Sequence, residues 1–492
     1  MNYLKKNFLN SGIIVTTLIS FSLWFSLGTK LQIDEKLLIE KKILLENFRY
    51  IFPFIILILI TILKKENKNL KKLKFIILII FASCLIGYIN FYFLNDNYLY
   101  NLTQDEVLIG NGYIPDKTKD FIFCFYFIVT FLIFIKLNNE EVKKINIINY
   151  IFVIIISLVT LYYAFEEYFK NTNYYLYNAD FLVQGEILGV SSSKSLGLSR
   201  NLVIITIPLM IFCFFFKKKN IIEYLAYFIL TIIIALIIHS QSRTSNYFFY
   251  FLVFLIFFIK IMQKEYKDLI IIFFVTIIIP FILTHTIPKI KIYFVNQTLL
   301  ENDNRLEKND NRLEKKDNRL EKKDNRLEKK DNRLLSINPN NLTEYQDIKN
   351  YNLNAYTSGR INLWKKTIEI FFNEENLKFK ILGFGPRSDR YLIKENLSNA
   401  LIYFFLAGGL LGLVGILLLY ATSIKEVIKF ISFKKNISSD LLGYSSIVIL
   451  IFLIARSLVE NSFAVFGTDH IIFITNLIFI KNKNNKIFKK IL

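Results

Sequence analysis

Six arginines are the residues of this chain best suited to chemistry. They lie in segments that border long apolar stretches, at Arg200, Arg243, Arg360, Arg387, Arg390 and Arg456. A guanidinium is planar and always charged, and it binds two phosphate oxygens through parallel hydrogen bonds. A charge at the edge of an apolar span is costly and is functional by default, although an interfacial arginine can also serve only as an anchor to lipid phosphate. We therefore expect these arginines to bind a phosphorylated ligand.

The sequence shows no pattern for a metal or cofactor site. The three cysteines lie in apolar segments and show no pairing pattern, and the spacing of His239, His285 and His470 makes no metal motif. The chain also has no phosphate-binding glycine loop, dinucleotide fingerprint or nucleophile elbow. We expect neither a metal nor a cofactor.

The elements that must position the arginines are predicted to be transmembrane helices. The chain has 492 residues, and 53% of them are hydrophobic, which favours an all-α polytopic membrane protein over several soluble domains. The first apolar run has no small-residue cleavage site after it and is expected to be a retained span. Apolar runs long enough for a bilayer predict about twelve spans. They lie near 11–31, 49–63, 73–94, 120–138, 145–165, 201–216, 221–238, 246–262, 268–287, 398–421, 441–457 and 469–481.

The lysines predict how these spans are oriented. Seven short segments, which are the two termini and alternate loops, hold 26 lysines and eight carboxylates. By the positive-inside rule these segments face the cytoplasm, so both termini are expected there. All twelve arginines fall on or beside the opposite side. The same distribution argues against a nucleic-acid partner, because the positive charge is spread over short segments that would face anionic lipid.

A large outer loop separates the ninth span from the tenth. Within it, residues 303–335 repeat the heptapeptide Asp-Asn-Arg-Leu-Glu-Lys-Lys. One leucine per heptad cannot form a coiled-coil seam, so the repeat is interpreted as a solvated spacer. Near 360–373, apolar residues at helical spacing predict an amphipathic helix: Ile361, Trp364, Ile368 and Phe371. The expected parts of the chain are a membrane domain of nine spans (1–287), the outer loop (288–397), the last three spans (398–481) and a cytoplasmic tail (482–492).

Short motifs on either side of the tenth span carry a family resemblance. They are Ser358-Gly359-Arg360 with Trp364, Gly383-Phe384-Gly385, Ser398-Asn399, and Gly409-Leu410-Leu411-Gly412. In this order they resemble the O-antigen ligase and polymerase family of bacterial membrane glycosyltransferases. The Ser242-Arg243 and Arg200-Asn201 pairs are similar to further family elements. The resemblance covers roughly residues 198 to 470 and is densest between 358 and 412. Close helix packing is the preferred interpretation of the glycines Gly408, Gly409, Gly412 and Gly415.

The resemblance implies an enzyme of the bacterial inner membrane. It would move a glycan from an isoprenoid pyrophosphate carrier to an acceptor, such as a lipid A-core sugar, at the periplasmic face. An acceptor that is another carrier-linked unit would make the protein a polymerase, and a protein acceptor would make it an O-oligosaccharyltransferase. The implied partners are the carrier-linked glycan, its acceptor and membrane lipids. The six arginines would then bind the pyrophosphate, whose negative charge grows as it leaves.

One position departs from the family pattern and leaves the proton acceptor open. Where ligases carry a histidine, this chain has Ser398, whose hydroxyl is a poor base near neutral pH. Asn399 remains and is expected to orient the acceptor. Another outer group could take the proton, and the candidates are Asp389, Glu395 and His470. Alternatively, the departing pyrophosphate takes it, or the chain is inactive.

A transporter without catalysis is the more distant alternative. Polar residues inside spans and internal symmetry between halves would be its signature. The spans read as almost uniformly Ile, Leu and Phe, and no repeated half is found. These features, together with the large outer loop, favour the enzyme.

Overall fold

The computed structural model describes the chain in separate helical stretches. The described residues are Ile19, 53–62, 70–93, 117–170, 196–216, 221–239, 243–286, 360–373, 377–393, Leu397, 399–433, 440–459 and 468–491. Within them every regular element is a helix, which confirms the all-α prediction for this part of the chain. The repeat at 303–335 lies outside it. The helices are α4 (Lys71–Phe93), α6 (Lys117–Ile135), α7 (Asn139–Lys170), α9 (Leu196–Phe215), α10 (Ile221–His239), α11 (Arg243–Met262), α12 (Tyr266–Phe273), the π-helical turn η3 (Phe274–Ile278), α15 (Arg360–Asn373), α16 (Leu377–Leu382), α17 (Ser388–Leu392), α18 (Ala400–Phe433), α19 (Leu441–Ser457) and α20 (Thr468–Ile491).

Seven helices of the described part are long and apolar enough to cross a membrane. They cover Lys71–Phe93, Asn139–Tyr162, Leu198–Phe215, Ile221–Ile238, Ser245–Met262, Tyr266–Thr286 and Ala400–Ser432. Two shorter apolar helices, Pro53–Ile62 and Leu441–Ser457, coincide with predicted spans. The prediction of about twelve spans is not confirmed, and its first span lies outside the described residues except for Ile19. The helices support a membrane protein with several spans.

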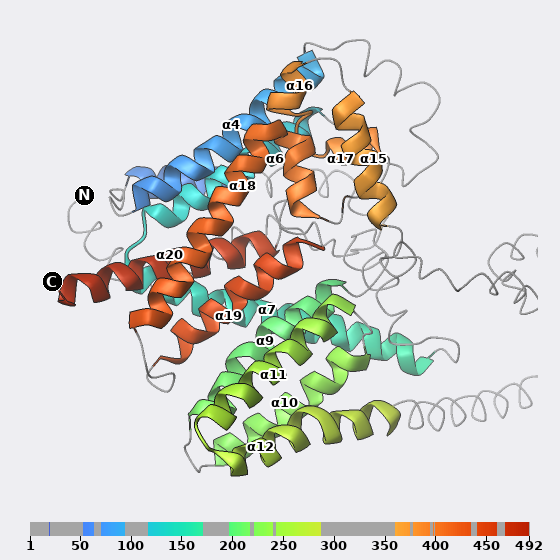
Figure 1. Cartoon of the computed structure of the whole chain (residues 1–492), viewed down its shortest axis with the longest axis vertical. Coiled ribbons are helices and arrows are strands. Elements are labelled where there is room, and N and C mark those ends of the chain that lie inside the picture. The colour runs from blue at the N-terminus through green and yellow to red at the C-terminus, as the bar shows by residue number, and fades with distance from the viewer. Residues whose placement is uncertain are drawn as a thin grey trace, which may run out of the picture.

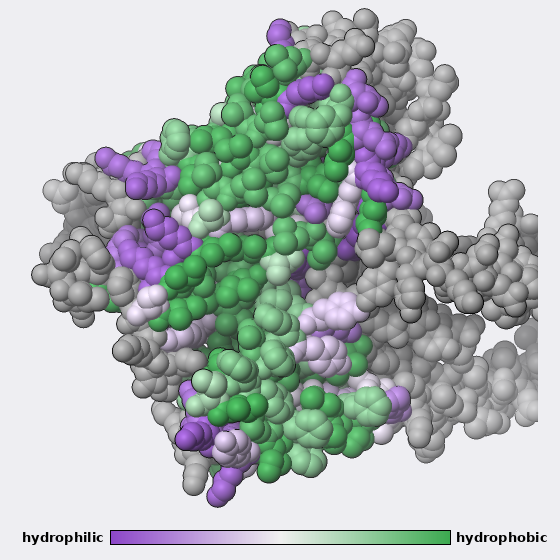
Figure 2. Space-filling view, in the orientation of Figure 1, coloured by the Kyte–Doolittle hydropathy of each residue, from purple (hydrophilic) through white to green (hydrophobic). Residues whose placement is uncertain are grey.

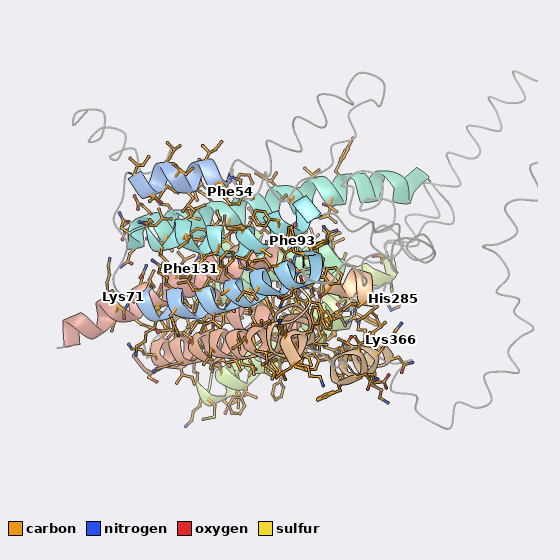
Figure 3. All side chains as sticks on the ribbon, turned by 90° about the horizontal axis from the view of Figure 1, so that it is seen from above. Phe54, Lys71, Phe93, Phe131, His285 and Lys366 are labelled. Carbon is orange, nitrogen blue, oxygen red and sulfur yellow. The ribbon has the colours of Figure 1, made fainter. Side chains whose placement is uncertain are left out.

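The helices form one elongated bundle with two distinct ends. The short helices α15, α16 and α17 lie near the C-terminal end of α4, and we call this the α15 end. The start of α4 and the C-terminal end of α20 lie at the opposite end, which we call the Lys71 end (Figure 1). The view from above shows Lys71 at one extreme and Lys366 and His285 at the other (Figure 3). The short helices α15, α16 and α17, which come from the predicted outer loop, therefore lie together at one end of the bundle.

The flanks of the bundle carry exposed apolar side chains. Figure 2 shows hydrophobic residues over the faces of the helices and hydrophilic residues mainly toward the two ends. Phe75 on α4, Phe228 on α10 and Phe254 on α11 are among the large apolar side chains that remain exposed. So much apolar surface is unfavourable in water, and a lipid environment explains it.

Side-chain caps fix where several helices begin. At the start of α7, the Glu141 amide donates to Asn138 Oδ1 (2.9 Å) and the Asn138 amide donates to Glu141 Oε2 (3.0 Å), which is a reciprocal capping box. Asn399 Oδ1 accepts from the Ile402 amide (3.1 Å) at the start of α18. Asp440 Oδ1 does the same for the Gly443 amide (3.1 Å) at the start of α19. Each cap satisfies a backbone donor that the helix itself leaves without a partner.

Helices α4 and α18 pack closely through glycines. A Cβ atom added at Gly408 would lie 2.7 Å from Ser83 Oγ, and one at Gly415 would lie 2.5 Å from Ile80 Cγ1. A Cβ at Gly87 would lie 2.7 Å from the Ala407 carbonyl oxygen. These approaches confirm the predicted packing role for Gly408 and Gly415 and bring the backbones of the two helices together.

Helix α18 is broken at Gly409, and the turn after α16 fills the break. Gly409 has φ 61° and ψ −154°, a conformation that glycine adopts without a Cβ clash. The Phe384 amide donates to the Leu406 carbonyl (2.9 Å), and the Gly385 amide donates to the Ala407 carbonyl (2.8 Å). The turn thus satisfies carbonyls that the break leaves open, which a membrane protein must do within itself.

A buried polar network links α7, α19 and α20. Asn146 Nδ2 donates to Asn476 Oδ1 (3.0 Å) and to Ser446 Oγ (3.2 Å), and the Tyr150 hydroxyl also donates to Asn476 Oδ1 (3.2 Å). The expectation of almost uniformly apolar spans is therefore wrong for these helices. These polar side chains stand in largely apolar runs of the sequence, and their partners lie on another helix.

Candidate functional site

The centre of the candidate site is a buried ion-pair cluster contributed by three helices. Arg456 stands in the last turn of α19 and Asp469 in the first turn of α20, and the side chain of each is 2% exposed. Arg456 Nε donates to Asp469 Oδ2 at 3.2 Å. Arg200, from the first turns of α9, places Nη1 3.0 Å from Asp469 Oδ1. Two guanidinium groups therefore share one carboxylate, and the cluster keeps a net positive charge.

The C-terminal end of α19 gathers two further predicted residues. Asn399 Nδ2 donates to the Leu458 carbonyl oxygen at 2.7 Å, and Arg360 Nη1 donates to the Val459 carbonyl oxygen at 2.5 Å. Carbonyls at a helix C-terminus have no partner within the helix and favour cationic donors. These bonds attach the start of α15 and the start of α18 to the helix that carries Arg456.

Side chains that border the ion-pair cluster hold it in position. Asn201 Oδ1 accepts from Arg200 Nε (3.0 Å), which turns that guanidinium toward Asp469. The Tyr420 hydroxyl and Ser457 Oγ lie 2.6 Å apart, which joins α18 to the residue next to Arg456. His470 follows Asp469 and is fully buried. The geometry fixes the orientation of both arginines before any ligand arrives.

Arg387 and Asp389 organise the neighbouring turn. Arg387 adopts a left-handed conformation (φ 63°) directly after Gly385 and Pro386, and its amide donates to the Tyr403 hydroxyl at 3.0 Å. Asp389 Oδ2 accepts from the Leu397 amide at 3.0 Å, which closes the segment that leads to Asn399. Both side chains are buried, with 5% and 1% of their surface exposed. Asp389 is therefore a positioning residue of this turn as well as a candidate base.

Not every predicted residue is brought to this cluster. Ser398 and Glu395 lie outside the described residues. Arg243 begins α11 and Arg390 lies within α17, and the structure describes only the backbone of these two. The described part of the chain contains no group of three or more His, Cys, Asp or Glu that could hold a metal ion.

Sequence reasoning missed the role of Asp469 as the shared partner of two arginines. The sequence also places Glu460 one helical turn after Arg456, and Glu460 lies outside the described residues. Asp469 comes 13 positions after Arg456 and reaches it only because α19 and α20 pack side by side. The signal that could have found it was an acidic residue in the first turn of a predicted span on the arginine-rich side.

The cluster has the properties of an anion site. Arg456 Nη1 is buried and makes no hydrogen bond to any described residue. A buried guanidinium nitrogen without an acceptor is costly, and a phosphate oxygen would satisfy it. In a medium of low dielectric constant, the net positive charge of the cluster attracts an anion more strongly than it would in water. A search of protein families, of curated proteins and of solved structures found no match to this chain.

Proposed function

We propose that the protein is an O-antigen ligase-like glycosyltransferase. It would move a glycan from an isoprenoid pyrophosphate carrier to an acceptor, lipid A-core or similar, at the periplasmic face of the bacterial inner membrane. The observation that carries this proposal is the convergence of Arg200, Arg360 and Arg456 on one end of α19. They come from segments far apart in the sequence, and a purely structural use would not require three guanidinium groups at one point.

The chemistry of glycosyl transfer explains why such a cluster is useful. The oxygen of an acceptor hydroxyl attacks the anomeric carbon of the carrier-linked sugar. The bond between that carbon and the phosphate oxygen breaks, and the pyrophosphate leaves with the electron pair. Negative charge therefore grows on the phosphate as the reaction proceeds, and prearranged guanidinium groups stabilise it most in the transition state. Asp469 would hold the two guanidinium groups together until the phosphate binds.

The proton of the acceptor hydroxyl needs a recipient. Asp389 and His470 are buried in the described structure, so either would accept a proton only from a hydroxyl that enters the site. Glu395 is the third candidate, and the leaving pyrophosphate is the alternative. Asn399 uses its amide to hold Leu458 and its carbonyl to cap α18, so its proposed role is to position the start of α18.

Reconstitution tests this proposal directly. Purified protein in liposomes, with a carrier-linked glycan and a candidate acceptor, is expected to produce a glycosylated acceptor and free carrier pyrophosphate. Accumulation on a lipid A-core acceptor would identify a ligase, lengthening of the carrier-linked glycan a polymerase, and a labelled protein an oligosaccharyltransferase. If glycan crosses the membrane without transfer, the protein is a transporter.

The buried network around Asn146 and Asn476 is the feature that favours a transporter as the second candidate function.

Topology is a second expected result. A reporter fused after Lys219 or Lys435 is expected to be cytoplasmic, and one inserted within 303–335 is expected to be periplasmic, because lysine-rich segments remain inside. Alkaline phosphatase and green fluorescent protein fusions report the two sides in opposite senses. A cytoplasmic repeat would place the arginine cluster on the wrong face for this chemistry.

A further inference from the structure

A second basic site lies at the Lys71 end of the bundle, far from the arginine cluster. Its central residue is Lys481, which stands on α20 and is only 7% exposed. Lys481 makes no hydrogen bond or ion pair with any residue that the structure describes. Lys483, two positions later on α20, is satisfied within the protein. It forms an ion pair with Asp440 and lies over the ring of Phe430. Most of the Lys481 side chain is buried, and an external anion would stabilise the positive charge that it carries.

The surroundings of Lys481 add positive charge. The hydrogen bond from Asn484 to Glu426 places the stretch of α18 that holds Lys425 and Lys429 beside Lys481, which stands one turn before Asn484 on α20. Lys72, at the start of α4, adds a further positive charge at this end. Glu426 is the single carboxylate that acts on Lys481 in the described structure. Asn484 Nδ2 already donates to Glu426 Oε2 at 2.8 Å and to the Glu426 carbonyl oxygen at 2.9 Å, which anchors this carboxylate to α20. The described residues of the site thus carry more positive than negative charge.

Apolar surface adjoins this charge. Phe75 follows Lys72 by one turn of α4 and is 65% exposed, and Ile428 lies beside Lys425 and Lys429 on α18 and is 59% exposed. Figure 2 shows hydrophilic residues where α4 begins and where α18 and α20 end, directly next to the hydrophobic flanks of these helices. A small soluble anion would gain nothing from the apolar flank, whereas a phospholipid would use both surfaces.

We propose that Lys481, Lys72, Lys425 and Lys429 bind the phosphate headgroup of an anionic phospholipid whose acyl chains lie along the exposed faces of α4 and α18. The headgroup oxygens would occupy the space in front of the Lys481 ammonium, and the three other lysines would surround it. The site is independent of the arginine cluster and of the proposed transfer reaction.

The test compares matched lysine variants of the full-length protein in nanodiscs. The probe is phosphatidylglycerol in a phosphatidylcholine background, and the lipid that stays bound after detergent exchange is measured by native mass spectrometry. Lys481→Gln and Lys425→Gln are each expected to lower phosphatidylglycerol retention about fivefold, the effect of one lysine near a membrane surface. Lys486→Gln removes one exposed charge from the same helix, and its retention is expected to match that of the unmodified protein.

Two results would overturn the proposal. One is equal retention by the unmodified protein, Lys481→Gln and Lys425→Gln. The other is displacement of bound phosphatidylglycerol by inorganic phosphate at comparable concentration, which would identify a site for a free anion. If Lys481→Gln does not fold, Lys425→Gln decides the question, because Lys425 is exposed and its replacement leaves no buried group without a partner.

Discussion

Arg456→Lys is expected to reduce glycosyl transfer by about a hundredfold or more, the usual cost of one lost donor to a developing negative charge. The guanidinium of Arg456 uses Nε for Asp469 and leaves Nη1 for a ligand. A lysine has a single ammonium group and cannot serve both at this geometry. Transfer rates in proteoliposomes, at equal amounts of inserted protein, provide the measurement.

Matched variants separate this effect from charge and from stability. Lys366→Gln removes one exposed charge from α15 near the site, and it is expected to leave the rate unchanged. Arg360→Lys keeps the charge that faces the end of α19 but loses the planar set of N–H donors of the guanidinium. We expect a large loss of transfer in this variant as well. An unmodified rate in Arg456→Lys would reduce the arginine to a structural partner of Asp469.

Asp469→Asn provides a second measurement on the same cluster. Replacing the carboxylate with an amide of the same shape removes the negative charge that both arginines share. If a phosphate displaces Asp469, inorganic pyrophosphate should protect this variant against heat more strongly than it protects the unmodified protein. Weaker protection would mean that Asp469 is needed to form the anion site rather than to occupy it.

Gly409→Ala is expected to prevent normal folding of the membrane domain. The residue has a positive φ, and an added Cβ would collide with the Ile381 carbonyl oxygen. Backbone strain and overpacking together predict a loss on the order of 3 kcal/mol, a large share of the stability of an ordinary domain. The yield of monodisperse protein after detergent extraction, and its melting temperature, would show this loss.

Gly408→Ala is the matched control, one residue earlier in the same helix. Its Cβ would meet the Ser83 hydroxyl at 2.7 Å, and that contact is a side chain rather than backbone. We expect a smaller loss than for Gly409→Ala, and a partial recovery when Ser83→Ala is added. Equal losses for the two glycine variants would show that tight packing, and not the break in α18, limits folding.

The sequence predicted six arginines on one side of the membrane, and three of them converge in the described structure. Assigning the Lys-rich segments to one side of the membrane predicted that the arginines would share the other side, and in the structure Arg200, Arg360 and Arg456 meet at one end of α19. The segment at 360–373 was also predictable, because its apolar residues recur at helical spacing and α15 occupies that range.

The partners of these residues could not be predicted, since they depend on how helices pack. A pattern read along one helix offers partners three or four positions away, whereas Arg456 finds Asp469 on the next helix and Asn399 finds the Leu458 carbonyl 59 positions away. The break at Gly409 was equally hidden, because a Gly-Gly pair in an apolar run is also the pattern of an unbroken, closely packed helix.

The turn Gly383-Phe384-Gly385 is hydrogen-bonded to the break in α18, and this contact also constrains the order of assembly. Gly87 on α4 packs against both the turn and the broken helix, and it leaves the ribosome long before the turn that covers it. During synthesis, the close-packing face of α4 must wait in the bilayer for a segment made hundreds of residues later. The α15 end is therefore completed late, and a chain that stops before Gly383 leaves α4 without the backbone that seals it.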